Sequence, residues 1–274
     1  MSVVRDYYNR CAEEEWERLD LDAFHRLEFR ATMQCLHDHV PPSGLVLDAG
    51  GGPGRYTREL CRLGYEVVLL DLTENCVALA QAKLAAEPPA VATRLRRAEV
   101  GDIRDLSRFA DRTFDAVLCL GGPLSHTIGE QQRKKALAEF VRVAAPGAPV
   151  ILSVIGYYAV MRVVLSLSPI ELSMPEKRPL FERGDHLIVG SFPEAHLFRP
   201  EELQREAKAA GLHTVELRAC EGLSSNLGDA TNALQEHDDG RWEQWLEVLD
   251  ARRHDPAVVA TSEHFLYVGR TRSA

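Results

Sequence analysis

The sequence predicts an α/β fold built on a mostly parallel sheet, and two observations predict it. Short apolar segments alternate five times with amphipathic segments over the first 156 residues. Continuous apolar segments are typical of strands that helices cover on both faces, and such units join parallel strands by right-handed crossovers. In addition, a glycine cluster directly follows the first apolar segment, as in a tight turn from a strand into a helix.

The composition bounds the class of protein. The chain has 274 residues, of which 45% are hydrophobic and 27% charged, and its net charge is −9. A nucleic-acid binder usually carries a basic excess, whereas small basic clusters such as residues 133–135 are expected here on solvated faces. We therefore expect no nucleic-acid partner.

Neither the cysteines nor the apolar segments indicate a special environment. The six cysteines contain no C-x-x-C pair, so the sequence predicts no disulfide framework and no metal site. The most lipid-like segment, residues 148–161, is shorter than the ~20 residues that span a bilayer. The first residues contain no apolar signal region. A cytoplasmic protein without a membrane partner is the resulting expectation.

The N-terminal region has a helical pattern. Apolar side chains recur at helical spacing over residues 3–40, and Asp20 or Asp22 is suited to cap the second helix. A breaker cluster at residues 41–44 ends the region. Residues 1–43 are expected to form a helical cap over a ligand cleft.

The stretch 44–56 is the part around which the chain is organised. Its apolar residues end in Asp48, and Gly50, Gly52 and Gly54 follow at alternating positions before an amphipathic segment. A dinucleotide-binding turn has the spacing G-x-G-x-x-G and faces a pyrophosphate, which an acid would repel. Asp48 suits a cationic ligand instead. The alternative is a glycine-rich turn without a ligand.

This stretch resembles the first motif of class I S-adenosylmethionine-dependent methyltransferases of the small-molecule type. The resemblance covers residues 44–156 by motif and the remainder by architecture. It implies a Rossmann-like three-layer α-β-α sandwich with a seven-stranded, mostly parallel sheet whose last strand is antiparallel. It also implies S-adenosyl-L-methionine as cofactor, with S-adenosyl-L-homocysteine as product, and Asp48, Gly50 and Gly52 as cofactor-binding residues.

The second predicted strand carries the next matching feature. Residues 66–72 form an apolar segment in which Asp71 comes 23 residues after Asp48 and is followed by Leu72. A carboxylate at this strand end can accept from both hydroxyls of a ribose, so Asp71 and Leu72 are expected at the cofactor. The alternative role of Asp71 is to favour the N-terminus of the next helix.

The third predicted strand, residues 93–100, is followed by Asp102 and Ile103. In the family that this chain resembles, an acid at this place accepts from the adenine amino group, and the next backbone N–H reaches the ring. Asp102 and Ile103 take these two places. Asp102 is equally suited to cap the turn at residues 104–109.

The fourth predicted strand, residues 114–120, leads into a second glycine loop that ends in His126. Ligands of open α/β sheets bind at such strand ends, so Leu120 is expected at the cofactor. A neutral imidazole can take a proton from an attacking hydroxyl or amine, which makes His126 the candidate catalytic base. The alternative is a structural histidine bonded to the loop backbone.

In the N-terminal cap, the resemblance singles out Tyr8 and Arg30. A tyrosine and an arginine of this region often hold the carboxylate of the cofactor in the resembled family. Packing for the tyrosine and surface solvation for the arginine are the alternatives.

The chain departs from strand–helix alternation at residues 157–198. We expect this insertion after the fifth strand, residues 150–155, to be a lid over the substrate, with an aromatic content suited to a small molecule. His196 is either an alternative base or a strand-end histidine. Residues 199–274 are expected to complete the sheet of a single domain, 1–274.

The sequence therefore predicts a methyltransferase that transfers a methyl group to an O or N nucleophile of a small molecule. As an assembly, a monomer or a homodimer is expected. Two alternatives stay open: a nicotinamide-dependent oxidoreductase, against which Asp48 and the glycine spacing argue, and a non-catalytic cofactor-binding module.

Overall fold

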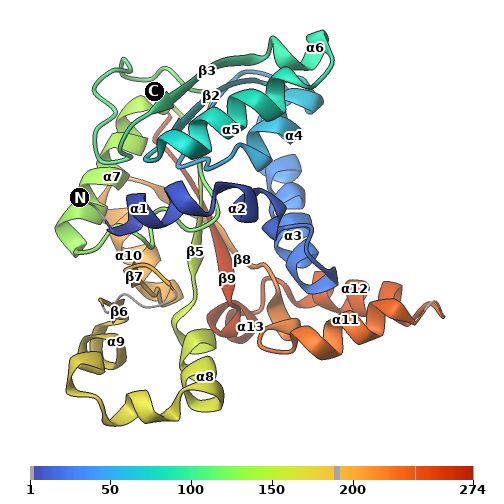
Figure 1. The fold of residues 1–274 in the computed structure, drawn as a ribbon. Helices are drawn as coiled ribbons and strands as arrows, with labels where there is room; N and C mark the ends of the chain where they lie inside the picture. Colours follow the sequence, from blue (N-terminus) through green and yellow to red (C-terminus); the bar gives the residue numbers. More distant parts are fainter. Residues whose placement is uncertain (1–2, 188–191, 238, 274) are drawn as a thin grey trace.

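A seven-stranded sheet runs through the centre of the computed structural model, which describes residues 3–187, 192–237 and 239–273 (Figure 1). The strand order is β3-β2-β1-β4-β5-β9-β8, and β9 is antiparallel to both of its neighbours, whereas the other pairs are parallel. This confirms the predicted sheet, including its antiparallel last strand. The strands are β1 (Leu45–Ala49), β2 (Glu66–Asp71), β3 (Leu95–Val100), β4 (Ala116–Cys119), β5 (Pro149–Ile155), β8 (His213–Ala219) and β9 (His264–Arg270).

Helices cover both faces of the sheet and complete three layers. On one face, α7 (Glu130–Val143), α10 (Pro200–Ala209) and α13 (Pro256–Thr261) bury strand residues such as Leu47 and Val117. On the other face, α3 (Ala23–His39), α4 (Arg55–Leu63) and α5 (Glu74–Ala85) bury their neighbours Val46 and Leu118. Successive strand residues point to opposite faces, so a strand covered on both sides must be apolar throughout. That is why these strands appear as continuous apolar segments.

The strand order reverses next to β1, since β2 lies on one side of it and β4 on the other. In open parallel sheets a crevice forms at the carboxyl ends of the strands at this point. No helix separates β3 from β4 among the described residues, and residues 101–115 form turns there instead. The loops after β1, β2, β3 and β4 therefore meet at one edge of the sheet.

The N-terminal cap consists of three helices rather than the two expected. α1 (Val3–Arg10) and α2 (Ala12–Arg18) precede α3, and Asp22 caps α3 by accepting a hydrogen bond from the backbone N–H of His25 at 2.9 Å. Arg5 and Asn9 of α1 contact Glu74 and Asn75 at the start of α5. Figure 1 shows α1 and α2 lying across the ends of the strands.

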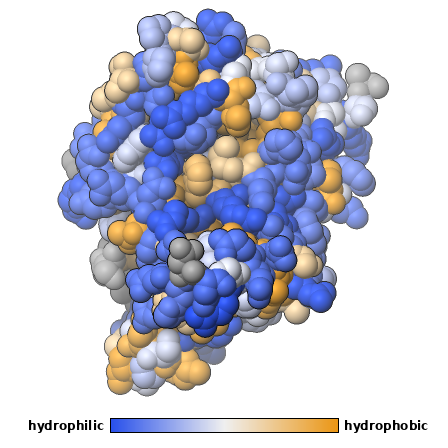
Figure 2. Space-filling model, turned by 90° about the vertical axis from the view of Figure 1, so that its right-hand side faces the viewer, coloured by the Kyte–Doolittle hydropathy of each residue, from blue (hydrophilic) through white to orange (hydrophobic). Residues whose placement is uncertain are grey.

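The insertion after β5 contains α8 (Tyr157–Leu167), the 3-10 turns η1 (Pro169–Ser173) and η2 (Pro175–Lys177), α9 (Arg178–Arg183) and a hairpin of β6 (Asp185–His186) with β7 (Ala195–His196). Residues 188–191 of the expected lid lie outside the described residues. The insertion has its own apolar cluster, and Leu165, Leu167 and Ile170 are exposed at its tip. Figure 2 shows apolar side chains gathered at this lower end of the molecule.

His196, an alternative base in the sequence prediction, has a structural role. It is buried, and its ring nitrogens lie 2.7 Å from Asp185 and 3.1 Å from Glu202 of α10. These contacts use both nitrogens to hold the hairpin of the insertion against α10. The alternative of a strand-end histidine therefore describes it correctly.

The C-terminal part adds α11 (Gly228–Glu236) and α12 (Arg241–Arg252) beside α3, and α6 (Pro89–Ala92) follows α5. No helix of the described part of the chain combines the length and the apolar character needed to cross a bilayer.

A buried ion pair joins α7 to α10 and corrects one sequence prediction. Arg133, expected on a solvated face, is 3% exposed, and its guanidinium donates to both carboxylate oxygens of Glu206 at 2.6 and 3.0 Å. α10 supplies the carboxylate that makes burial of this arginine possible. The sequence could not show this partner because it lies 73 positions away.

This pair predicts a large effect on stability. Arg133→Leu leaves the Glu206 carboxylate buried without a countercharge, which costs about 3–5 kcal/mol. The double variant Arg133→Leu/Glu206→Leu should recover most of that loss. Urea unfolding of the wild type and both variants measures it, and a single variant within about 1 kcal/mol of the wild type would contradict the role of the pair.

Candidate active site

A cavity of about 250 Å³ lies at the carboxyl edge of the sheet, where the strand order reverses. Its wall combines the loops after β1, β2, β3 and β4 with side chains of α1 and α2. All but two of the residues that the sequence predicts as catalytic base or cofactor-binding residues line this one cavity, although they come from five separate segments. They are Tyr8, Gly50, Gly52, Asp71, Leu72, Asp102, Ile103, Leu120 and His126.

The glycine loop between β1 and α4 has a backbone that only glycine adopts readily. Gly50 and Gly52 have φ angles of +81° and +54°, in the left-handed region. A Cβ atom on Gly50 would lie 2.5 Å from Pro123, whereas one on Gly52 would meet nothing within 4 Å. Gly50 is thus required for packing against the loop after β4, and Gly52 leaves its backbone open to the cavity.

Asp48 does not line the cavity, although the sequence prediction brings it to a cationic ligand. It is fully buried behind the loop, where the hydroxyl of Thr57 donates to it at 2.6 Å. A Cβ on Gly51 would come within 2.6 Å of the same carboxylate. Burial raises the pKa of Asp48 to about 6. Its position supports the glycine loop from behind, because this side chain points into the core under α4.

Asp71 does reach the cavity and also fixes the glycine loop. One carboxylate oxygen accepts from the backbone N–H of Gly52 at 2.8 Å, and the other accepts from the N–H and hydroxyl of Thr73 at 2.9 and 2.7 Å. Burial raises the pKa of Asp71, against these hydrogen bonds. A carboxylate has about four acceptor sites, so acceptor capacity remains for a ligand hydroxyl.

Asp102 lies at the cavity and also caps the turn that follows it. It lines the cavity beside Ile103, and it also accepts from the backbone N–H of Arg104 at 2.8 Å. The guanidinium of Arg104 contacts the same carboxylate. Burial alone would raise the pKa of Asp102, but the hydrogen bonds from Arg104 lower it. Asp102 therefore stays an anionic acceptor at neutral pH.

Tyr8 and His126 are in direct contact, 2.8 Å from hydroxyl oxygen to Nε2, although 118 positions separate them. The other ring nitrogen, Nδ1, lies 2.8 Å from the carbonyl oxygen of Glu194. Because a carbonyl can only accept, Nδ1 carries the hydrogen and Nε2 accepts from the Tyr8 hydroxyl. Burial lowers the pKa of His126, which keeps the imidazole neutral and able to accept a proton.

Arg30 is a correction to the sequence prediction. Its guanidinium donates to both oxygens of Asp250 on α12 at 2.5 Å, and it does not line the cavity. Position 30 of the chain faces α12 because α3 packs along the C-terminal helices. Arg18 of α2 lies in the cavity instead. The sequence hint for Arg18 is that it is a single basic residue among acidic ones. Its place in the cavity depends on the break between α2 and α3, which the sequence pattern does not predict.

A second cavity of about 240 Å³ adjoins the first and shares Tyr8, Arg18 and His126 with it. Its wall contains a chain of ion pairs. Arg18 lies 2.6 Å from Glu28, and His264 of β9 lies 2.8 Å from Glu221 and 3.7 Å from Glu28. Tyr8 and His126 thus lie at the boundary between two cavities, where they can contact a ligand in either one.

The charges in this chain of ion pairs are fixed by their neighbours. Burial alone would lower the pKa of His264, but Glu28 and Glu221 raise it to about 9. Burial alone would raise the pKa of Glu28, but Arg18 and then His264 lower it to about 2. The imidazolium of His264 and the carboxylate of Glu28 are therefore charged at neutral pH, and they neutralise one another.

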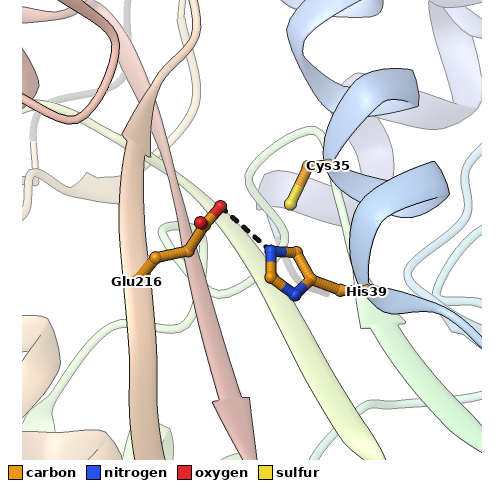
Figure 3. Close-up of side chains that lie close together, drawn as sticks. All are labelled: Cys35, His39 and Glu216. Atoms are coloured by element: carbon orange, nitrogen blue, oxygen red, sulfur yellow. Dashed lines mark ion pairs between the residues drawn. The ribbon is translucent and has the colours of Figure 1, made fainter.

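A separate group, Cys35, His39 and Glu216, brings three possible metal-ligand atoms within 4.8 Å of one another. Figure 3 shows the two α3 side chains next to Glu216 of β8. The site does not suit a metal, because Arg218 also contacts Glu216 at 2.9 Å and burial raises the pKa of the Cys35 thiol to about 12. The ion pair of His39 with Glu216, at 3.2 Å, attaches the end of α3 to the sheet.

The chain is similar to known methyltransferases. A family model described as a methyltransferase domain matches residues 46–147. The chain is 33% identical over 141 residues to a glycine/sarcosine N-methyltransferase from Parasynechococcus marenigrum (strain WH8102), which is 51% of this chain and 46% of that protein. It is 31% identical over 147 residues to a glycine/sarcosine N-methyltransferase from Aphanothece halophytica, which is 51% of this chain and 53% of that protein. It spans about half the length of these curated relatives.

The fold is also found in solved structures. A SAM-dependent methyltransferase from Methanosarcina mazei superposes with a TM-score of 0.61 at 18% identity, covering 88% of this chain and 98% of that chain. An identity this low supports the fold alone.

Fold and cavity together define a Rossmann-like α/β protein with a nucleoside-type site at its strand ends. With the methyltransferase domain matched over residues 46–147, the chain is similar to the class I S-adenosylmethionine-dependent methyltransferases, whose cofactor is S-adenosylmethionine. The residues present fit that cofactor. Asp71 retains acceptor capacity for ribose hydroxyls, and Gly52 leaves the backbone uncovered.

Asp71 and Arg30 give a matched test of the site. Asp71→Ala should weaken binding of S-adenosylhomocysteine by about 10–100-fold, since hydrogen bonds to a charged group are worth about 1.5–3 kcal/mol. Arg30→Ala should leave the affinity unchanged because Arg30 lies outside the cavity. Calorimetric titration of both folded variants measures this. Equal affinities for wild type and Asp71→Ala would remove Asp71 from the cofactor site.

His264 predicts a pH dependence of stability. Its folded pKa of about 9 lies above the ordinary value of 6.5, so its protonation stabilises the folded state fully below pH 6.5, and this contribution is lost as the pH rises to about 9. His264→Gln should therefore be clearly less stable than the wild type at pH 6, with a smaller difference at pH 9.5. Urea unfolding at the two pH values measures the differences. A difference independent of pH would mean that His264 is not charged in the folded protein.

Proposed function

We propose that the chain is an S-adenosylmethionine-dependent methyltransferase that methylates a nitrogen, or alternatively an oxygen, of a small molecule. The observation that carries the proposal is the Tyr8–His126 hydrogen bond at the boundary of the two cavities. The N-methyltransferase activity named for both curated relatives supports nitrogen as the acceptor atom. In this proposal the cofactor binds in the first cavity and the acceptor binds in the second.

The predicted site residues have distinct roles in this proposal. Asp71 and Asp102 accept from the ribose and the adenine, while Ile103, Leu72 and Leu120 supply apolar surface around them. Gly50 and Gly52 let the backbone approach, and Asp48 holds their loop from behind. Arg30, expected to hold the cofactor's carboxylate, has no role in the proposal because Asp250 holds it outside the cavity.

When bound, the cofactor supplies a methyl group on a positively charged sulfur, which is already a strong electrophile. The protein mostly has to align the acceptor, which is worth up to about 7–11 kcal/mol in favourable cases. Tyr8 and His126 complete the reaction. The Tyr8 oxygen accepts a hydrogen bond from the acceptor N–H, and the proton that the acceptor loses passes through Tyr8 to Nε2 of His126.

His126→Ala and Tyr8→Phe test the proton path. Both variants should lower kcat by about 10²–10⁴-fold, the usual contribution of a general base, and they should leave cofactor affinity within about twofold. Single-turnover assays by mass spectrometry, which follow a gain of one methyl group on small amines, measure the rate, and calorimetry measures the affinity.

Arg178→Ala, an exposed change on α9 away from both cavities, is the control. If the two variants kept the wild-type rate, the proton path would be wrong. If no amine or alcohol were methylated by wild-type protein that binds the cofactor, the activity itself would be wrong, because this fold is not confined to one reaction.

A further inference from the structure

A third cavity, of about 350 Å³, lies under the insertion and continues the second one. The two share Ile155, Phe192, Glu263 and His264. Since the second cavity also shares residues with the first, the three follow one another from the glycine loop to the insertion. The ring of Phe192 lies 5.5 Å from that of His126 and 6.3 Å from that of His186, between the second and third cavities.

The wall of the third cavity is mostly aliphatic. Val160, Val163 and Val164 contribute from α8, and Leu180 and Leu197 contribute from the rest of the insertion. Among its fewer polar residues, Glu171 is neutralised by Lys177 at 2.9 Å. Binding of an apolar group in such a cavity is favourable, because it removes apolar surface from water and requires no polar partner.

Glu263 stands where the second and third cavities join, and its charge is not neutralised like those of its neighbours. One of its oxygens accepts from the backbone N–H and side-chain amide of Asn226 at 2.7 and 3.1 Å. Within residues 3–187, 192–237 and 239–273, no arginine, lysine or histidine forms an ion pair with it, whereas Glu28 and Glu221 are both paired. Burial, followed by the nearby Glu221, raises the pKa of Glu263 more than Asn226 and His264 lower it, as expected of a buried carboxylate without an ion-pair partner.

We infer that the acceptor is an amine with an apolar chain or ring, whose nitrogen occupies the second cavity between Tyr8 and Glu263 and whose apolar part fills the third. This inference depends on the proposed methyltransferase function and specifies its substrate class. The ammonium form binds beside the carboxylate of Glu263, gives one proton through Tyr8 to Nε2 of His126, and only then attacks the methyl group, so that the methylated product leaves as an ammonium. Glycine fits poorly for two reasons. It would leave the aliphatic cavity empty, and its own carboxylate would lie beside those of Glu28, Glu221 and Glu263.

The experiment compares acceptors of one series on the full chain with saturating cofactor. Primary n-alkylamines from two to eight carbons, 2-phenylethylamine, glycine, sarcosine and the matched n-alkanols are assayed for kcat/KM. Each methylene that enters the aliphatic cavity should raise kcat/KM by about three- to fourfold, until the cavity is full. Hexylamine should exceed both glycine and hexanol by at least about 100-fold.

Two variants, each with a matched control, separate the two parts of the inference. Val163→Phe fills the aliphatic cavity and should abolish the gain with chain length, while Leu165→Phe, exposed on the same helix, should not. Glu263→Gln should raise KM for amines at least tenfold and leave kcat nearly unchanged. Glu243→Gln, exposed on α12, should do neither. Unchanged binding of S-adenosylhomocysteine verifies that each variant is folded.

The outcomes distinguish failure of this inference from failure of the proposed function. Methylation of glycine or sarcosine with the highest kcat/KM, or rates independent of chain length, would overturn the apolar amine while leaving a methyltransferase. Equal rates for amines and alcohols, unaffected by Glu263→Gln, would overturn the role of Glu263. Cofactor binding without methylation of any acceptor would overturn the proposed function itself.

Discussion

The hydrogen bond from the Gly52 N–H to the Asp71 carboxylate is the interaction on which the rest of the site depends. It joins the loop after β1 to the end of β2, and the bonds from Thr73 fix the same carboxylate at the start of α5. Two strand ends and two helix N-termini are thereby held in one arrangement. A loop of glycines has large conformational freedom when unfolded, so a fixed anionic acceptor beneath it is what makes its backbone a defined surface.

Much of this arrangement is predictable from local sequence, because the carboxyl ends of parallel strands meet at one edge. An acid or glycine placed directly after an apolar strand must therefore lie at that edge, as Asp71, Asp102, Gly52 and His126 do. Whether the side chain of such a residue faces the cavity or the core cannot be predicted from the neighbouring sequence. Asp48 occupies the right edge but points under the loop, since its direction depends on the pleat of β1 and on the packing of α4.

What could not be predicted depends on contacts between distant segments. The local sequence does not indicate which of Arg18 and Arg30 lines the cavity. The turn between α2 and α3 brings Arg18 there, whereas Asp250, 220 positions after Arg30, holds Arg30 elsewhere. The burial of Arg133 depends in the same way on Glu206. The cavity under the insertion has no sequence signature, because its aliphatic wall comes from helix residues that would otherwise be assigned to a core.

The charges around the two cavities suit the proposed pair of ligands, a cationic cofactor and an amine. Opposite charges that are already paired, such as Arg18 with Glu28 and His264 with Glu221, contribute structure but little net field. The negative potential that a ligand meets in the cavities therefore comes mainly from carboxylates that form no ion pair. Asp71 is one such group at the cofactor side and Glu263 is another at the far side of the second cavity. The Tyr8–His126 pair lies between them, and burial keeps its imidazole neutral there.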